Sequence, residues 1–214
     1  MSLRAVLFDL DGTLIDSHDD ILAAVAAAAL ENGFEAPAAQ AVRELVGLPL
    51  ALMFRTLLGQ ELSDAAVASL ASSYRSHFGT SRTRVFAGVH QAIAAIAPHA
   101  LLGIATTKRT SHAESVVTAL SLQAHFHVVQ GTDDFPAKPA PDVLLHALAR
   151  LEVPPEQAAY VGDGPWDMKA ARAGRLLAIG VDHAGDRRGE LLAAGALRVL
   201  RAMDDLPPLL DGLY

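Results

Sequence analysis

Short apolar runs alternate with amphipathic stretches along most of this chain. The first run, Ala5-Val6-Leu7-Phe8, is continuously apolar, which is typical of a strand buried on both faces of a sheet. Strands are predicted over 4–9, 101–105, 126–129, 158–161, 176–180 and near 197–200. Helices are predicted over 88–97, 110–120, 140–150 and 165–173. This alternation predicts a parallel sheet with helices on both faces.

Residues 16–83 follow a different pattern, because no strand signal lies between 16 and 80. The spacing of apolar residues predicts helices over 17–31, 37–46, 49–58 and 63–78. Ser17 is expected to cap the first of these helices, with Asp20 in an arrangement like a capping box. The predicted fold class is therefore α/β, with a helical insert after the first strand. The core comprises residues 1–15 and 84–214, and the insert comprises 16–83.

Composition and charge exclude several classes of protein. An apolar content of 51% is ample for a buried core, and a net charge of −7 argues against a nucleic-acid partner. The absence of cysteine excludes thiolate zinc sites and cysteine nucleophiles. The longest uncharged apolar run, 21–30, is too short to cross a membrane, and no signal-peptide pattern opens the chain. We therefore expect a cytoplasmic protein with no membrane partner.

Two carboxylates, Asp9 and Asp11, follow the first strand directly, and Gly12 then permits a sharp turn. In an α/β sheet this is where active sites are built. Two like charges held close repel each other, and burial increases the cost, unless a cation or a shared proton compensates. The pair therefore predicts a metal ion, a proton-transfer role, or both.

Three further polar groups follow other predicted strands. They are Thr106-Thr107-Lys108, Lys138-Pro139-Ala140-Pro141, and Gly162-Asp163 with Asp167. Because the carboxyl ends of parallel strands share one edge, these groups should converge with Asp9 and Asp11. Together they suit phosphoryl transfer: a carboxylate nucleophile, a carboxylic acid for proton transfer, an anion site, a lysine, and oxygen ligands suited to Mg²⁺.

These groups, in this order, resemble the four motifs of the haloacid dehalogenase superfamily. The run Asp9-x-Asp11-Gly12-Thr13, the Lys138-Pro139 run and the Gly162-Asp163-x-x-x-Asp167 run carry the resemblance. It implies a parallel Rossmann-like sheet core, with the insert as a small α-helical cap. Among subfamilies, the chain most resembles phosphoglycolate-phosphatase-like hydrolases. One departure is Thr107, where relatives often carry asparagine.

The resemblance also implies a role for each motif residue. Asp9 would be the nucleophile and Asp11 the general acid and base. Thr106, Thr107 and Lys138 would bind the substrate phosphate, and Lys138 would also steady Asp9. The cofactor would be Mg²⁺, held by Asp9, Asp163 and the backbone carbonyl of Asp11. Asp167 would order the waters around the metal.

The expected activity is Mg²⁺-dependent hydrolysis of a small phosphorylated metabolite, by a monomer or homodimer. Two alternatives stay open: a β-phosphoglucomutase-like phosphosugar mutase and a non-catalytic phosphate-binding protein on the same fold. The stretch comparable to the mutase substrate loop, 46–51, is apolar here, which disfavours the first. The intact set of Asp9, Asp11, Lys138 and Asp163 disfavours the second. A dehalogenase would have no use for Asp11 or a metal site, and no nucleotide-binding glycine motif occurs.

Overall fold

The computed structural model describes residues 2–213, and the chain forms two compact units. One unit contains Met1–Ile15 and Val85–Tyr214, and the other contains Asp16–Arg84. The chain passes between the units at two places, where the short strands β2 (Ile15–Asp16) and β3 (Arg84–Val85) pair with each other. The sequence pattern did not predict this pairing, because two-residue strands carry too little periodicity to be recognised.

A six-stranded parallel sheet forms the centre of the first unit, which confirms the predicted α/β class. The spatial order is β5-β4-β1-β6-β7-β8. The strands are listed here in chain order: β1 (Ala5–Phe8), β4 (Leu101–Thr106), β5 (Val128–Gly131), β6 (Ala158–Gly162), β7 (Leu177–Val181) and β8 (Arg198–Leu200). Chain order reverses direction beside β1, so β1 and β6 lie at the switch point where such sheets bind ligands.

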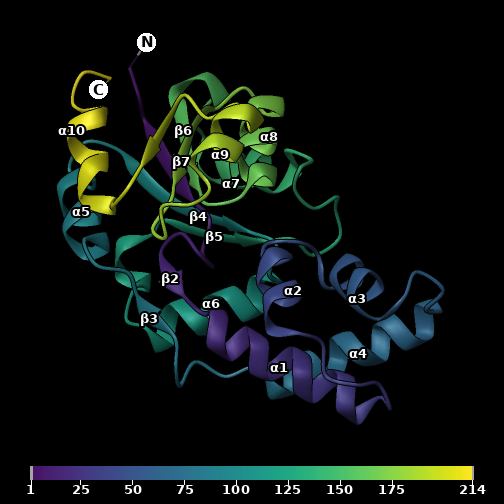
Figure 1. The fold of residues 1–214 in the computed structure, drawn as a ribbon. Helices are drawn as coiled ribbons and strands as arrows, with labels where there is room; N and C mark the ends of the chain where they lie inside the picture. Colours follow the sequence, from purple (N-terminus) through teal and green to yellow (C-terminus); the bar gives the residue numbers. More distant parts are fainter. Residues whose placement is uncertain (1, 214) are drawn as a thin grey trace. The chain divides into compact units, whose positions relative to one another are not determined.

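Helices cover both faces of this sheet (Figure 1). The connections contain α5 (Val89–Ile96), α6 (Thr110–Ala119), α7 (Asp142–Leu151), α8 (Pro165–Ala173), α9 (Arg188–Ala194) and α10 (Leu206–Leu210). Figure 1 shows α7, α8 and α9 together on one side, with α5 and α10 on the other. Ala5 and Leu7 pack in one buried cluster with residues of α7 and α8. This alternation along β1 is expected for a central strand that is covered on both faces.

Single-turn helices η1 (Gln123–His125), η2 (Pro155–Gln157) and η3 (Met203–Asp205) complete the first unit. The sequence pattern misplaced one element of this unit and missed another. Residues 126–129 were expected to form a strand, but β5 begins two residues later, and the Phe126 ring packs edge-on against Phe8 instead. Helix α9 was missed because it is short and carries Gly189, so its apolar pattern is weak.

The second unit is a small helical bundle. It contains α1 (His18–Glu31), α2 (Ala39–Glu44), α3 (Leu50–Leu58) and α4 (Asp64–His77), which share a buried apolar cluster. The expected capping box on α1 is wrong, because Ser17 makes no capping hydrogen bond with its side chain. The Asp20 carboxylate instead accepts hydrogen bonds from Thr83 and from the backbone N–H of Arg82. Within residues 2–213, no helix is long and apolar enough to cross a membrane.

Candidate active site

The sheet register brings the predicted motif residues to one edge of the first unit. Phe8 of β1 is level with Ile104 of β4 and with Val161 of β6. Asp9, Thr106 and Asp163 all follow these paired positions within two residues, at the carboxyl ends of three adjacent strands. The Asp9 N–H donates to the carbonyl of Val161, which fixes the backbone of Asp9 against β6. The parallel sheet therefore assembles groups that lie far apart in sequence.

Asp9 is almost completely buried, with 2% of its surface exposed. Its Oδ1 atom lies 3.0 Å from the ammonium of Lys138. Yet Oδ1 accepts no hydrogen bond of good geometry from any described residue. Burial raises the pKa of Asp9 to about 7, with Lys138 opposing the rise and the nearby Asp167 carboxylate adding to it. A buried carboxylate in this state has unused capacity to accept a proton or bind a cation.

Lys138 lies in the loop between β5 and α7 and is also buried. Its ammonium contacts Asp9 Oδ1 at 3.0 Å, Asp167 Oδ1 at 2.5 Å and the Tyr160 hydroxyl at 2.9 Å. Burial opposes the charge, but Asp167 and Asp9 outweigh it and raise the pKa of Lys138 above its ordinary value. The ammonium therefore stays charged, and its position is set by three oxygen atoms.

Asp163 approaches the turn after β1 because residue 12 is glycine. Gly12 has a φ of +79°, and a Cβ there would lie 2.4 Å from Asp163 Oδ2. The Thr13 hydroxyl donates to Asp163 Oδ1 at 3.0 Å, and Arg187 lies 3.8 Å from Oδ2. Burial, followed by the Asp167 carboxylate, raises the pKa of Asp163 to about 7. Gly12 is thus required both by the backbone turn and by the close carboxylate.

Whereas the Asp9 carboxylate pairs with Lys138, the Asp11 carboxylate pairs with Lys108. Its Oδ2 atom lies 2.9 Å from the Lys108 ammonium, and both side chains are 9% exposed. Lys108 belongs to the turn after β4, directly beyond Thr106 and Thr107. The two aspartates of the motif therefore occupy distinct electrostatic environments, which suits two different chemical roles.

Thr106 is the last residue of β4 and is buried, and Thr107 follows it half-buried in the turn. The Thr106 hydroxyl accepts a hydrogen bond from the Lys108 N–H at 3.4 Å. The chain then enters α6 at Thr110. The register puts Thr106 at the same edge as Asp9, and its role toward a phosphate stays a prediction.

The carboxylates fit a hard cation. Asp9, Asp163 and Asp167 each offer an oxygen, and these atoms lie within 4.8 Å of one another. The hydrogen-bond-free Asp9 Oδ1 and the raised pKa values of Asp9 and Asp163 show that positive charge would be favourable here. Asp167 is less available, because its carboxylate accepts from Lys138 and from the Gly164 N–H. This difference favours Asp9 and Asp163 as the direct ligands.

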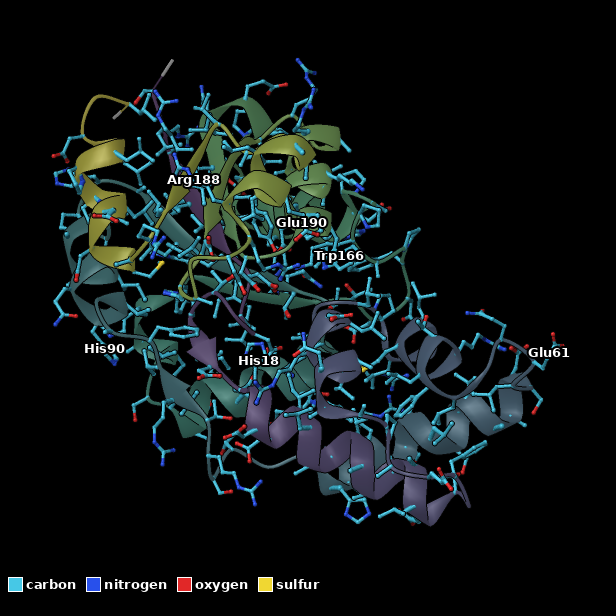
Figure 2. All side chains as sticks on the ribbon, in the orientation of Figure 1. His18, Glu61, His90, Trp166, Arg188 and Glu190 are labelled. Atoms are coloured by element: carbon cyan, nitrogen blue, oxygen red, sulfur yellow. The ribbon has the colours of Figure 1, made fainter. Side chains whose placement is uncertain are left out.

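Four residues of this edge received no role from the sequence: Thr13, Lys108, Tyr160 and Arg187. Thr13 and Lys108 adjoin predicted site residues, so their positions were a usable signal. Tyr160 was a further usable signal, because a tyrosine within an apolar strand has a buried phenol that needs a hydrogen-bond partner. Arg187 lies in the loop before α9, whose helix was missed. In Figure 2, Trp166 and Glu190 mark the first turns of α8 and α9, and Glu190 pairs with Arg187.

Comparison with known proteins agrees with this geometry. A family model described as "Haloacid dehalogenase-like hydrolase" matches residues 6–181. "Probable phosphatase IndB" of Dickeya dadantii is 31% identical over 196 residues, covering 88% of this chain and 85% of that protein. "Phosphoglycolate phosphatase" of Pseudomonas putida is 29% identical over 218 residues, covering 98% of this chain and 79% of that protein.

A solved structure extends the likeness to the whole chain. The crystal structure of a hydrolase from Pseudomonas syringae superposes with a TM-score of 0.86 at 27% identity, covering 99% of each chain. The likeness therefore includes both the sheet unit and the helical unit.

Proposed function

Because this chain belongs to the haloacid dehalogenase-like hydrolases, we propose that it is a Mg²⁺-dependent phosphatase that acts through an aspartyl-phosphate intermediate. That the chain is a phosphatase follows from its family and from its phosphatase relatives. The metal, the intermediate and the substrate class are the proposed parts. The substrate class is a small phosphorylated metabolite such as phosphoglycolate, as the name of the P. putida relative suggests.

The observation that carries this proposal is the state of Asp9. Its carboxylate is buried directly after β1, and it lies 3.0 Å from a lysine that has no solvent exposure on its side chain. Structural carboxylates at such depth are normally satisfied by hydrogen-bond donors, but Asp9 Oδ1 has none of good geometry among the described residues. A group kept in this condition is suited to attack phosphorus, because it is already desolvated and oriented.

The reaction proceeds in two displacements at phosphorus. A carboxylate oxygen of Asp9 attacks, the bond from phosphorus to the ester oxygen breaks, and Asp11 gives its proton to the departing alcohol. Asp11 then takes a proton from water as the water oxygen attacks the phosphorus. The acyl-phosphate bond breaks, inorganic phosphate leaves, and the Asp9 carboxylate is regenerated.

Other residues stabilise the charge that develops during transfer. Lys138 holds Asp9 in place and offers a fixed positive charge to the phosphoryl oxygens. Thr106 and Thr107 supply hydroxyl groups at the end of β4, and the turn that follows offers backbone N–H groups to an anion. Asp9, Asp163 and the Asp11 carbonyl would hold Mg²⁺, with Asp167 ordering its waters. The metal supplies positive charge to the phosphoryl group.

The helical unit supplies the substrate-selecting part in this proposal. Residues 16–83 would be the cap domain, and residues 1–15 and 84–214 would be the catalytic core. Its own helices bury a separate apolar cluster, so the unit has a core independent of the sheet. We propose no nucleic-acid or membrane partner, and a monomer or homodimer as the active form.

Phosphate release from a panel of small phosphate esters tests the proposal. The wild type should release phosphate with Mg²⁺ and not with excess chelator. Asp9→Asn should reduce turnover by at least about 1000-fold, because the nucleophile is removed. Asp211→Asn is the matched control: Asp211 is exposed after α10, and this variant should keep the wild-type rate.

Two outcomes would contradict the proposal. Phosphate release by Asp9→Asn at the wild-type rate would remove Asp9 as the nucleophile. Isomerisation of a sugar phosphate without net phosphate release would assign the chain to the mutases instead.

A further inference from the structure

Tyr160 lies at the centre of the first unit, and its role is not explained by the proposed reaction. It belongs to β6, beside β1, and its side chain is fully buried among residues of α7 and α8. A ring alone would serve packing there, and a phenylalanine would do so without a hydroxyl to satisfy. The hydroxyl is directed into the polar edge of the sheet, where it meets Lys138.

The hydroxyl has three neighbouring polar atoms. It lies 2.7 Å from the Ala105 carbonyl, 2.9 Å from the Lys138 ammonium and 3.3 Å from Asp167 Oδ1. A hydroxyl has one proton to donate, and a carbonyl can only accept. Ala105 offers the closest acceptor, so the proton is directed there. The oxygen lone pairs then face Lys138, whose ammonium can only donate.

This arrangement directs the protons of Lys138. An ammonium has three N–H bonds, and Tyr160 and Asp167 accept one each. The remaining N–H bond is left on the side of Asp9 Oδ1, which forms an ion pair with the ammonium at 3.0 Å without good hydrogen-bond geometry. Without the hydroxyl, the ammonium would be free to turn further toward Asp167, which is already its nearest partner. Tyr160 therefore limits the movement of Lys138 away from Asp9.

The same hydroxyl also joins two strands at the catalytic edge. Ala105 directly precedes Thr106 on β4, and β4 and β6 are separated by β1. The phenol thus reaches across the central strand, from the strand that leads to Asp163 to the strand that ends at Thr106. One side chain links the lysine to the backbone beside the predicted phosphate-binding threonine.

We propose that Tyr160 is a positioning residue, which aims the Lys138 ammonium at Asp9 through its hydroxyl. The effect on turnover rests on the proposed phosphatase function, whereas the effect on Lys138 does not. Burial among carboxylates raises the pKa of Tyr160 well above its ordinary value, so the phenol keeps its proton. Tyr160 touches neither substrate nor metal in this account and acts only through its neighbours.

Tyr160→Phe removes the hydroxyl and keeps the packed ring. We expect kcat to fall about 10-fold or more, in keeping with the loss of a hydrogen bond to a charged group, with KM changed less than about two-fold. A role limited to packing or stability would lower the melting temperature and leave kcat unchanged well below that temperature. The split between kcat and KM therefore separates positioning from stability.

The Lys138 ammonium can also be observed directly by ¹H–¹⁵N NMR on protein labelled at lysine. The chain has only three lysines, Lys108, Lys138 and Lys169, so variants Lys108→Arg and Lys169→Arg assign the signals. We expect Tyr160→Phe to shift or broaden the Lys138 signal through faster proton exchange. Tyr74→Phe is the matched control, because it deletes a buried phenol hydroxyl from α4 in the helical unit. It should leave the Lys138 signal unchanged.

The outcomes separate the two proposals. A wild-type Lys138 signal or a wild-type kcat in Tyr160→Phe would overturn the positioning role, even though the ester panel supported a phosphatase. If the wild type hydrolysed no ester, the proposed function would fail, and the NMR result alone would decide whether Tyr160 positions Lys138. A changed signal together with a reduced kcat would support the role.

Discussion

Asp20 in the helical unit and Asp9 in the sheet unit are both buried aspartates, with 5% and 2% of their surface exposed. Asp20 accepts three hydrogen bonds of 2.7–3.0 Å from Arg82 and Thr83. Asp9 has an oxygen without a good hydrogen bond from the described residues, and burial, together with the neighbouring carboxylates, raises its pKa. The first carboxylate is satisfied within the fold, and the second is left to react or to bind.

This contrast shows that burial alone does not identify a functional carboxylate. What distinguishes Asp9 is the chemistry around it: a buried lysine, two more carboxylates and few donors. Such a cluster costs folding stability, because like charges are desolvated together. Natural active sites commonly trade stability for chemistry in this way. The following experiments perturb either the carboxylate cluster around Asp9 or the hydrogen bonds of Asp20.

The largest effect on stability is expected from Mg²⁺ acting on the sheet unit. At a concentration of one hundred times its Kd, a ligand specific to the folded state adds about 2.7 kcal/mol to the free energy of unfolding. Mg²⁺ should therefore raise the melting temperature, because it offsets the repulsion among Asp9, Asp163 and Asp167. Calorimetry with Mg²⁺ and with excess chelator measures the shift.

Asp163→Asn should abolish most of this Mg²⁺-dependent shift, since it removes one of the proposed ligands. Asp20→Asn should keep the full shift, because Asp20 lies outside the carboxylate cluster. A full shift in Asp163→Asn would contradict the assignment of Asp163 as a metal ligand.

A smaller effect is expected from Asp20 itself. Asp20→Asn removes the negative charge from the side chain that accepts from Arg82 and Thr83, so these donors meet a neutral amide oxygen in place of a carboxylate. The free energy of unfolding should fall by about 1–2 kcal/mol, because a hydrogen bond to a charged acceptor stabilises more than one to a neutral acceptor. Chemical denaturation measures this change.

Asp19→Asn is the matched control on the same turn of α1. Its side chain is 67% exposed and its ion pair with Arg43 is 3.8 Å long, so the change should be within about 0.5 kcal/mol. Equal losses in the two variants would mean that the Asp20 hydrogen bonds do not stabilise the unit.

Much of the fold was predictable because its signals are local. The continuous run of 5–8 and the later strand–helix alternation predicted the parallel sheet, which the structure confirms. The pairing of β2 with β3 and the partners of Asp20 were not predictable, because both depend on residues far away along the chain. Ser17 and Asp20 matched a local capping pattern, but long-range hydrogen bonds to residues 82 and 83 prevailed.

In the candidate site, too, some features were predictable from the sequence and others were not. Asp9, Lys138 and Asp163 follow strand ends, so topology alone predicted that they would converge. Their partners could not be predicted: Lys108 for Asp11, Thr13 for Asp163, and Tyr160 for Lys138. These contacts depend on rotamers and on side-chain depth within the folded sheet, which no spacing in the sequence encodes. The roles of the site residues stay predictions until they are measured.

The central claim is that Asp9 carries the phosphoryl group, and trapping the intermediate tests it most directly. The protein is mixed with a turned-over ester and Mg²⁺, quenched during turnover and treated with borohydride, which reduces an acyl phosphate to an alcohol. Mass spectrometry should then find homoserine in place of aspartate at position 9, and only when ester and Mg²⁺ are present. Unmodified Asp9 under these conditions, or homoserine at another aspartate, would contradict the account.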